Sequence, residues 1–363
     1  MQEQRLDKPL RVLCLDGGGM RGIYTAAYLS FVASTFARRR GASSLDVGAG
    51  FDLIAGTSTG AIIGCGLALG IPLEKIVQLY RRHGKAIFPR KLPDKFSPNL
   101  AIDLRQRPRA LRKGEKALRA ALDDCFGTAT IGSVYAERKI ALAIPAVDIA
   151  QHRSWVFKTP HLQTSNHRDD NYTLVDVCLA TSAAPLFRSL AAIEPSSGVT
   201  SRMMFADGGL WANNPVLVGM IEALQMGSPD QPIEIFCLGT CSLPAGEDIS
   251  QVRADRGLLE WRFGGEAAKL AIDAQQFAYD HMARMLSKHV NRPCEVIRFP
   301  SNQVPAAMLK YLDLDDTRAE AADALVSQAR ADADMTNSRC SDPNDREGVM
   351  VNRLFLSIPA KGA

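Results

Sequence analysis

The chain has 363 residues, and its 43 lysine and arginine residues nearly balance its 39 aspartate and glutamate residues, which leaves a formal net charge of +4. That balance argues against a dedicated nucleic-acid-binding protein, and an apolar fraction of 46% argues against intrinsic disorder. Residues 1–10 contain no apolar stretch typical of a secretory signal, and the longest apolar segment, residues 61–73, is too short to span a bilayer. We therefore expect a soluble, cytoplasmic protein.

The eight cysteines contain no CxxC pair, and most of them lie in apolar runs that look like strands or helices. This distribution is typical of buried free thiols in a reducing compartment rather than of a disulfide framework or a zinc site. No other cluster of residues has the spacing of a metal site, so the sequence predicts neither a metal nor a cofactor.

Strand-like and helix-like segments alternate along the chain. Strands are expected at residues 11–16, 51–56, 139–147, 155–158, 203–207, 233–238 and 295–299. Helices are expected at residues 21–38, from residue 59 onward, and at residues 72–83, 174–182, 215–226, 257–290 and 317–334. The alternation predicts an α/β fold with a mostly parallel central sheet flanked by helices on both faces. Because no linker is visible, we expect one domain over residues 8–363, with its core motifs at 11–239 and a helical elaboration at 250–363.

The segment DGGGMRG, residues 16–22, lies between the first strand and the first helix. Consecutive glycines allow backbone N–H groups to converge beside a positive helix N-terminus, which suits a phosphate or an oxyanion. Gly17, Gly19 and Gly22 also fit the fingerprint GxGxxG, which predicts a Rossmann protein that binds NAD(P). That fingerprint expects an acidic residue after the second strand, where this chain has GTSTG. A plain tight turn is the remaining interpretation.

The segment GTSTG, residues 56–60, matches the GxSxG pattern of a nucleophile elbow. Such an elbow is a strained turn between a strand and a helix that exposes a serine Oγ. The segment follows a buried-type strand directly and precedes a helix, which distinguishes it from a chance match. We therefore predict that Ser58 is a nucleophile.

A nucleophilic serine needs a base. The six histidines lie mostly in polar, loop-like sequence or on the long C-terminal helix, and these settings favour surface or structural roles. Asp207 belongs to a DGG segment that ends a strand, which in a parallel sheet would place it at the same edge as Ser58 and the glycine loop. On the strand pattern alone, a turn-capping role for Asp207 is the favoured interpretation.

Five ordered motifs together carry a family resemblance. DGGGMRG, GTSTG and DGG, with ATSAAPLF at residues 180–187 and ANNP at residues 212–215, resemble the sequence blocks of the patatin-like phospholipases. The resemblance extends over residues 11–239 and implies a three-layer patatin-like fold. It also implies hydrolysis of a fatty-acyl ester without histidine, metal or cofactor.

Carried over to this sequence, the resemblance implies that Ser58 is the nucleophile and that Asp207 activates it. Arg21 is implied to assist the oxyanion or the lipid phosphate. The oxyanion hole is implied at the backbone amides of Gly17, Gly18 and Gly19. These roles favour the oxyanion interpretation of the glycine loop over the dinucleotide interpretation.

A narrower similarity lies beyond Ser58 and Asp207, in LGTCSLPAGE, the long helix and a late LDD segment. These features resemble patatin-like effectors of bacterial antiphage systems, which a cyclic di- or trinucleotide activates. The similarity implies antiviral defence, membrane phospholipids as substrate and action at the inner membrane surface, with no nucleic acid polymer as partner and with oligomerisation left open. The alternatives are a constitutive bacterial lipid acyl hydrolase and an inactive lipid-binding module.

Residues 84–113 are not explained by any catalytic motif. Nine basic residues against two acidic ones give this segment a net charge of +7, and four prolines predict that it is irregular. Three interpretations remain: a solvated loop, a surface that docks on an anionic leaflet, and a contact with a nucleotide phosphate or a partner subunit.

Overall fold

An eight-stranded sheet forms the centre of the computed structural model, which describes residues 8–91, 100–194, 202–241, 254–257, 261, 264–300 and 304–361. Its strands are β1 (Leu10–Leu15), β3 (Leu53–Gly56), β4 (Ala141–Asp148), β5 (Arg153–Lys158), β6 (Ala191–Ile193), β7 (Met203–Asp207), β8 (Ile233–Leu238) and β9 (Cys294–Arg298). They follow the order β6-β7-β4-β3-β1-β8-β9, and β5 pairs with β4. The run from β4 to β9 is parallel, whereas β5, β6 and β7 pair antiparallel with their neighbours.

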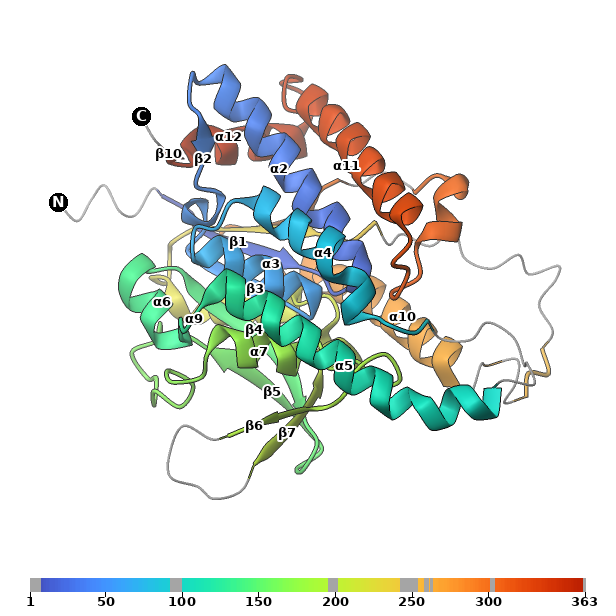
Figure 1. Ribbon diagram of the computed structural model, residues 1–363. Helices are drawn as coiled ribbons and strands as arrows, with labels where there is room; N and C mark the ends of the chain where they lie inside the picture. The colour runs from blue at the N-terminus through green and yellow to red at the C-terminus, as the bar shows by residue number, and fades with distance from the viewer. Residues whose placement is uncertain are drawn as a thin grey trace.

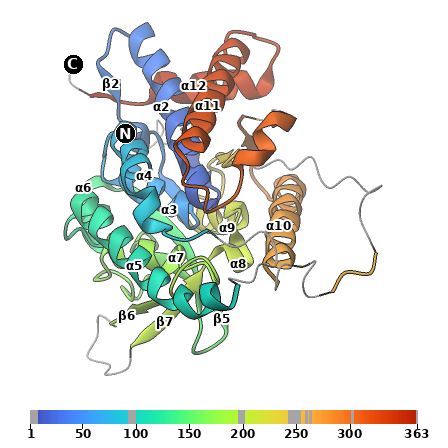
Figure 2. The same cartoon turned by 45° about the vertical axis from the view of Figure 1, so that its right-hand side comes forward.

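Helices cover both faces of this sheet (Figures 1 and 2). They are α2 (Gly22–Arg39), α3 (Thr59–Ala68), α4 (Leu73–Ile87), α5 (Leu100–Phe126), α6 (Ile131–Arg138), α7 (Leu174–Thr181), α8 (Gly209–Ala212), α9 (Val216–Met226), α10 (Gly265–Leu286), α11 (Ala319–Arg339) and α12 (Arg346–Ser357). The predicted fold class, a mostly parallel sheet between two helical layers, is confirmed.

The central strand β1 shows how one short sequence serves both layers. All six residues of LRVLCL are buried, as expected for the middle strand of a parallel sheet. Because side chains alternate along a strand, Leu13 and Leu15 join the core that contains α2, α3 and α4. Val12 and Cys14 face the other way and join the core that contains α8 and α9. All eight cysteines are free, and all but Cys125 are buried.

Helix α11 lies on α2 rather than on the sheet itself. Figures 1 and 2 both show α11 beside α2, and hydrogen bonds join Tyr24 Oη to Asp332 Oδ2 (2.6 Å) and Tyr28 Oη to Thr336 Oγ1 (2.7 Å). Strand β10 (Ala360–Lys361) then pairs antiparallel with β2 (Ser44–Leu45). The end of the chain is thereby joined to its first third.

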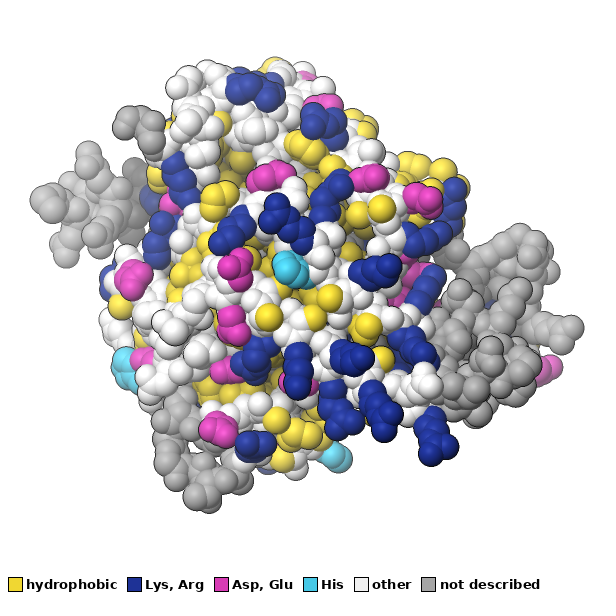
Figure 3. All heavy atoms as spheres, viewed as in Figure 1, with side chains coloured by type: hydrophobic (Ala, Val, Ile, Leu, Met, Phe, Trp, Pro, Cys, Tyr) yellow, Lys and Arg dark blue, Asp and Glu magenta, His cyan; other side chains and the backbone are white. Residues whose placement is uncertain are grey.

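The prediction that residues 84–113 are irregular is wrong for most of the segment. Helix α4 continues to Ile87, and α5 begins at Leu100 with Pro108 inside it. A proline in a helix removes one hydrogen bond and costs about 3 kcal/mol. The buried side chains of Leu118, Ala121 and Leu122 offset this cost by packing into the main core. Figure 3 shows lysine and arginine side chains gathered over the face along which α5 runs.

Other predicted boundaries are also corrected. The expected helix at residues 257–290 is shorter, since α10 begins after Gly264, whose φ of 92° is not helical. The expected helix at 317–334 continues to Arg339. Helix α6 was not predicted, although Thr130 and Ser133 form a capping box at its start. Helix α12 and strand β6 were also missed.

Phe355 of α12 is fully buried, and its ring stacks on Phe36 of α2 with 5.2 Å between the ring centroids. We expect Phe355→Ala to lower the free energy of unfolding by about 3–5 kcal/mol, because the cavity it leaves lies between two helices. The control is the neighbouring Leu356→Ala, whose side chain is 50% exposed and whose loss should cost about 0.5 kcal/mol or less. A single cooperative transition in both variants supports one domain over residues 8–363, and a separate early transition in Phe355→Ala would contradict it.

Candidate active site

Ser58 lies in a strained turn between β3 and α3. Its φ of 53° and ψ of −120° are unusual for a residue with a side chain, as expected for a nucleophile elbow. Glycine is required two residues later, because a Cβ on Gly60 would lie 2.2 Å from the carbonyl oxygen of Leu15. The start of α3 therefore packs directly against the end of β1. The elbow predicted from GTSTG has the expected strand–turn–helix geometry.

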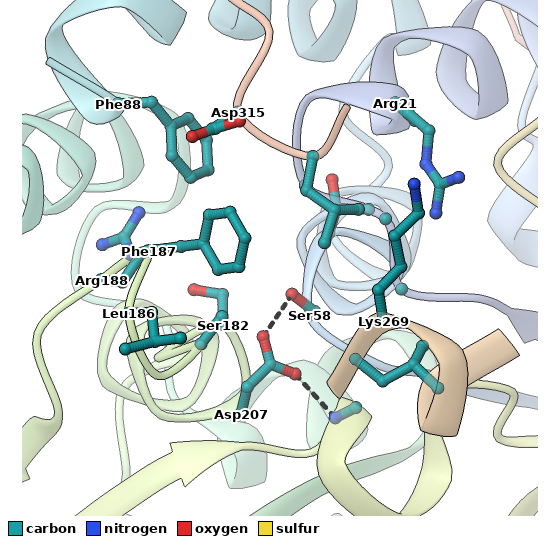
Figure 4. Close-up of a pocket in the computed structure, with 18 of the residues that line it drawn as sticks. Arg21, Ser58, Phe88, Ser182, Leu186, Phe187, Arg188, Asp207, Lys269 and Asp315 are labelled. Carbon is teal, nitrogen blue, oxygen red and sulfur yellow. Dashed lines mark hydrogen bonds between the residues drawn. The ribbon is translucent and has the colours of Figure 1, made fainter. Parts of the chain in front are cut away.

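Asp207 lies beside Ser58, but the strand that carries it is antiparallel to its neighbour, rather than parallel as the sequence predicts. Strand β7 is antiparallel to β4, with Asp207 opposite Ala146, at a point where β4 has passed the end of β3. The strand thus brings Asp207 back toward the sheet edge at which Ser58 lies. The Ser58 hydroxyl donates a 2.8 Å hydrogen bond to Asp207 Oδ2, and the Gly209 amide donates a 2.7 Å bond to Oδ1 (Figure 4).

Burial changes the acidity of this carboxyl group. Asp207 is 6% exposed, and loss of hydration raises the pKa of its side chain to about 6. The Gly209 amide, the Ser58 hydroxyl and the charge of Arg188 act in the opposite direction by stabilising the carboxylate. Asp207 is therefore a stronger base than an ordinary aspartate and is still ionised at neutral pH.

The ATSAAPLF block holds this pair in place. Thr181 Oγ1 accepts a 3.0 Å hydrogen bond from the Ser58 amide and donates a 2.6 Å bond to the carbonyl of Pro145 in β4. The Asp207 amide donates to the carbonyl of Ala183. One short segment at the end of α7 thus orients both the serine and the aspartate, a contribution that the sequence pattern alone did not specify.

The glycine loop contacts Ser58 from the other side. The Gly17 amide donates to the carbonyl of Asn213, and the Met20 amide donates to the carbonyl of Leu314. Within the described part of the chain, no acceptor binds the amides of Gly18 and Gly19. These two N–H groups are therefore available to an oxyanion, whereas the Gly17 N–H predicted to join them is already engaged.

A buried ion-pair network supports this loop, and sequence reasoning missed it. Arg298, at the end of β9, donates to Asp16 Oδ2 (2.7 Å) and to Asp280 Oδ2 of α10 (2.5 Å). Asn214 of the ANNP segment donates to Asp280, and Gln276 donates to Asp16. Burial raises the pKa of Asp16 to about 6, against the opposing charge of Arg298. No local motif marks Arg298, because its partners lie 18 and 282 residues away.

A cavity opens over Ser58 and Asp207. Its apolar wall comes mainly from α3, α4, α5 and the ATSAAPLF block, and includes Ile62, Ile87, Phe88, Leu118 and Phe187. Leu186 and Leu210 also line it, and their side chains are 44% and 46% exposed. The cavity therefore offers an apolar wall next to the serine hydroxyl and apolar side chains that reach solvent.

A family model described as patatin-like phospholipase matches residues 13–220, more than half of the chain. The chain belongs to the patatin-like phospholipase family. It is 30% identical over 343 residues to a Vibrio cholerae serotype O1 protein named cGAMP-activated phospholipase. The aligned region covers 90% of this chain and 91% of that protein. A Pseudomonas aeruginosa protein of the same name is 34% identical over 276 residues, 75% of this chain and 74% of that protein. The chain is thus an enzyme of the lipid acyl hydrolase class.

Two further predicted features of this patatin-like phospholipase can be located. Arg21 lines the cavity, is 6% exposed, and has an Nε atom without a hydrogen-bond partner. Burial lowers the pKa of its guanidinium, and Asp273 is the nearby carboxylate that opposes this shift most strongly. The six histidines do not line the cavity; His161, for instance, is bound to Glu222 on the opposite layer.

Within the described residues of this phospholipase, no group of three or more His, Cys, Asp or Glu side chains is arranged to hold a metal ion. The same residues form no helix that combines the length and the apolar character needed to cross a membrane.

The pKa of Asp207 predicts the pH dependence of hydrolysis. Only the carboxylate can accept the serine proton, so the active fraction falls as pH drops through about 6. We expect kcat/KM on a soluble acyl ester to decline about tenfold per pH unit below this midpoint. The melting temperature at each pH is the control for unfolding. An acid limb centred near pH 4 would contradict a buried Asp207.

Proposed function

We propose that this enzyme hydrolyses the fatty-acyl esters of membrane phospholipids, with Ser58 as nucleophile and Asp207 as general base. The observation that carries the proposal is the 2.8 Å hydrogen bond from the Ser58 hydroxyl to Asp207 Oδ2 at the base of an apolar cavity. Two amides without a partner among the described residues, those of Gly18 and Gly19, lie in the loop beside it.

The reaction proceeds in two halves. Ser58 Oγ attacks the ester carbonyl carbon while its proton passes to Asp207, and the carbonyl oxygen becomes an oxyanion that the Gly18 and Gly19 amides bind. When the intermediate collapses, the C–O bond of the ester breaks, and the lysophospholipid leaves with the proton from Asp207. Water then transfers a proton to Asp207 and attacks the acyl-serine. The bond between the acyl carbon and Ser58 Oγ breaks, Oγ takes the proton back from Asp207, and the fatty acid is released. Arg21 adds positive charge beside the glycine loop during both attacks.

A cyclic nucleotide is the proposed activator. Both bacterial relatives described above are named for activation by cGAMP, and the Vibrio protein matches over 90% of this chain. The match therefore includes the chain beyond the catalytic motifs, where a nucleotide-responsive part would have to lie. We extend this activation to the present chain, together with the antiviral role expected from its sequence.

Helix α5 is the proposed contact with the membrane. Its exposed cations recur every three or four residues, which places them on one helical face. They are Arg105, Arg109, Arg112, Lys113 and Lys116, and no described residue forms an ion pair with any of them. Arg107 is different: it is 8% exposed and donates a 2.8 Å hydrogen bond to the carbonyl of Leu186. The helix that carries the cationic face therefore also binds Leu186 at the edge of the cavity. This arrangement supports docking of α5 on the anionic inner leaflet.

The proposed chemistry and its activation are tested together on phospholipid vesicles, with and without cGAMP. Wild-type protein is expected to release fatty acid only when cGAMP is present, because a ligand that binds the active state more tightly shifts the population toward it. Ser58→Ala and Asp207→Asn should each lose at least about 10³-fold in rate under both conditions while keeping the wild-type melting temperature. Full activity without nucleotide would leave a constitutive hydrolase. Activity in folded Ser58→Ala would overturn the mechanism.

Docking by α5 is tested by reversing Arg105, Arg109 and Arg112 to glutamate and leaving the buried Arg107 intact. Binding to vesicles rich in phosphatidylglycerol should weaken by about tenfold or more at 0.1 M salt, and its salt dependence should flatten. The control reverses three exposed cations on other elements, Arg38, Arg153 and Lys288, with the same change in net charge. Equal loss of binding in both triple variants, or equal loss of soluble-ester hydrolysis and vesicle hydrolysis, would reject α5 as the docking surface.

A further inference from the structure

Arg188, which directly follows the ATSAAPLF block, is a buried cation in the wall of the catalytic cavity. Its side chain is 6% exposed, and its Nε atom is fully buried without a hydrogen-bond partner. In the described part of the chain no residue accepts a hydrogen bond or forms an ion pair with its guanidinium. Burial lowers the pKa of this guanidinium to about 10, so it stays positively charged at neutral pH.

Two other buried arginines are paired with carboxylates inside the protein. Arg11 pairs with Glu234 at 3.1 Å, and Arg298 pairs with two aspartates. A buried charge without a partner is costly, and proteins retain one chiefly where a ligand supplies the opposite charge. Arg188 and Arg21 are both cavity-lining guanidinium groups of this kind, and they lie on opposite sides of the Ser58–Asp207 pair (Figure 4).

The surroundings of the two arginines differ. Near Arg21, the carboxylates of Asp273 and Asp313 also line the cavity, and they would repel a second anion. Around Arg188 the cavity wall includes Leu186, Phe187 and the ring of Phe88, whose centroid lies 6.0 Å from the guanidinium carbon. Asp315 lies beside Phe88 in Figure 4, but it is not among the groups that shift the pKa of Arg188.

The ionisable groups that act on Arg188 are Glu115, Asp207 and Tyr80. Glu115 forms no ion pair with it, and Asp207 already accepts hydrogen bonds from Ser58 and Gly209. The tyrosine hydroxyl is un-ionised, because burial raises its pKa far above neutrality. Arg188 is therefore the cation on the cavity wall that is best placed to receive an anion from a ligand.

We propose that Arg188 binds the phosphate of the substrate lipid and makes the enzyme selective for phospholipids over neutral acylglycerols. This inference rests on the proposed function, since it requires that a lipid ester lies at Ser58. A phosphate beside Arg188 places the guanidinium in a short, charge-assisted contact inside a poorly hydrated cavity, where such contacts are strong. Arg21 then remains beside the glycine loop for the oxyanion.

The test compares phosphatidylethanolamine with diacylglycerol that carries the same two acyl chains, both in mixed micelles of a non-ionic detergent with cGAMP present. Wild-type protein should prefer the phospholipid, and Arg188→Met should lower kcat/KM for it by about 10- to 100-fold, mainly through KM. The neutral lipid should lose much less, so that the preference disappears. Arg188→Lys should keep part of the preference, because it keeps the charge without the planar fork.

Lys269→Met is the matched control, since Lys269 is a cation on the opposite wall of the same cavity. This variant should keep the wild-type preference. If Lys269→Met loses the preference equally, the effect is not specific to Arg188 and the proposal fails. The proposal also fails if Arg188→Met slows the hydrolysis of both lipids equally. A shift of the acid limb of the pH profile for both lipids would then show that Arg188 acts only through the charge of Asp207. If the activated wild type hydrolyses neither lipid, the proposed function itself is refuted.

A measurement on the wild type applies even if Arg188→Met does not fold. Lysophosphatidylethanolamine should inhibit hydrolysis of a soluble ester at least about tenfold better than monoacylglycerol of the same chain length. Equal inhibition by the two would overturn phosphate binding. Stronger inhibition by the free fatty acid than by the lysophospholipid would assign the anion site to the product carboxylate and would also overturn it.

Discussion

The active site depends on one buried arginine near the end of the sheet. Arg298 lies between Asp16, which is fully buried, and Asp280, which is partly exposed. Without Arg298, the buried Asp16 carboxylate would keep a hydrogen bond from Gln276 but no opposite charge. Asp16 begins the glycine loop, and Asp280 binds Asn214, the neighbour of the residue whose carbonyl engages the loop. The position of the two available amides therefore follows from an ion-pair network rather than from the glycines alone. The glycines permit the loop, and the network determines where it lies.

Buried charge is used in two opposite ways around this cavity. Arg298 is paired with two aspartates, so its charge is compensated within the protein. Asp207, Arg21 and Arg188 are buried with incomplete compensation, and their pKa values shift toward the neutral form. Groups in this state respond strongly to a proton or to an anionic ligand, because little water competes with either. The same desolvation that weakens the fold thus prepares the site for chemistry.

Much of the sheet and the central pair of the site could be predicted from the sequence, because the signals are local. Ser58 is marked by the residues on either side of it, and Asp207 by the glycines that follow a strand. The direction of β7 could not be predicted, since it depends on how far β4 extends past β3. Helix α5 was missed because Pro108 argues locally against a helix, whereas the buried side chains that stabilise it gain their energy from tertiary packing. Arg298 has no local signal at all.

The contact between Leu314 and the glycine loop bears on how the family is recognised. The carbonyl of Leu314 accepts the Met20 amide, and it lies so close to Gly19 that a Cβ there would be 2.3 Å away. The family match ends at residue 220, yet this carbonyl, Arg298 and strand β8 all come later in the chain. A homologous sequence can therefore carry every recognised motif and still lack the parts that shape its oxyanion loop. The residues that position this loop therefore have to be checked outside the range that the family model covers.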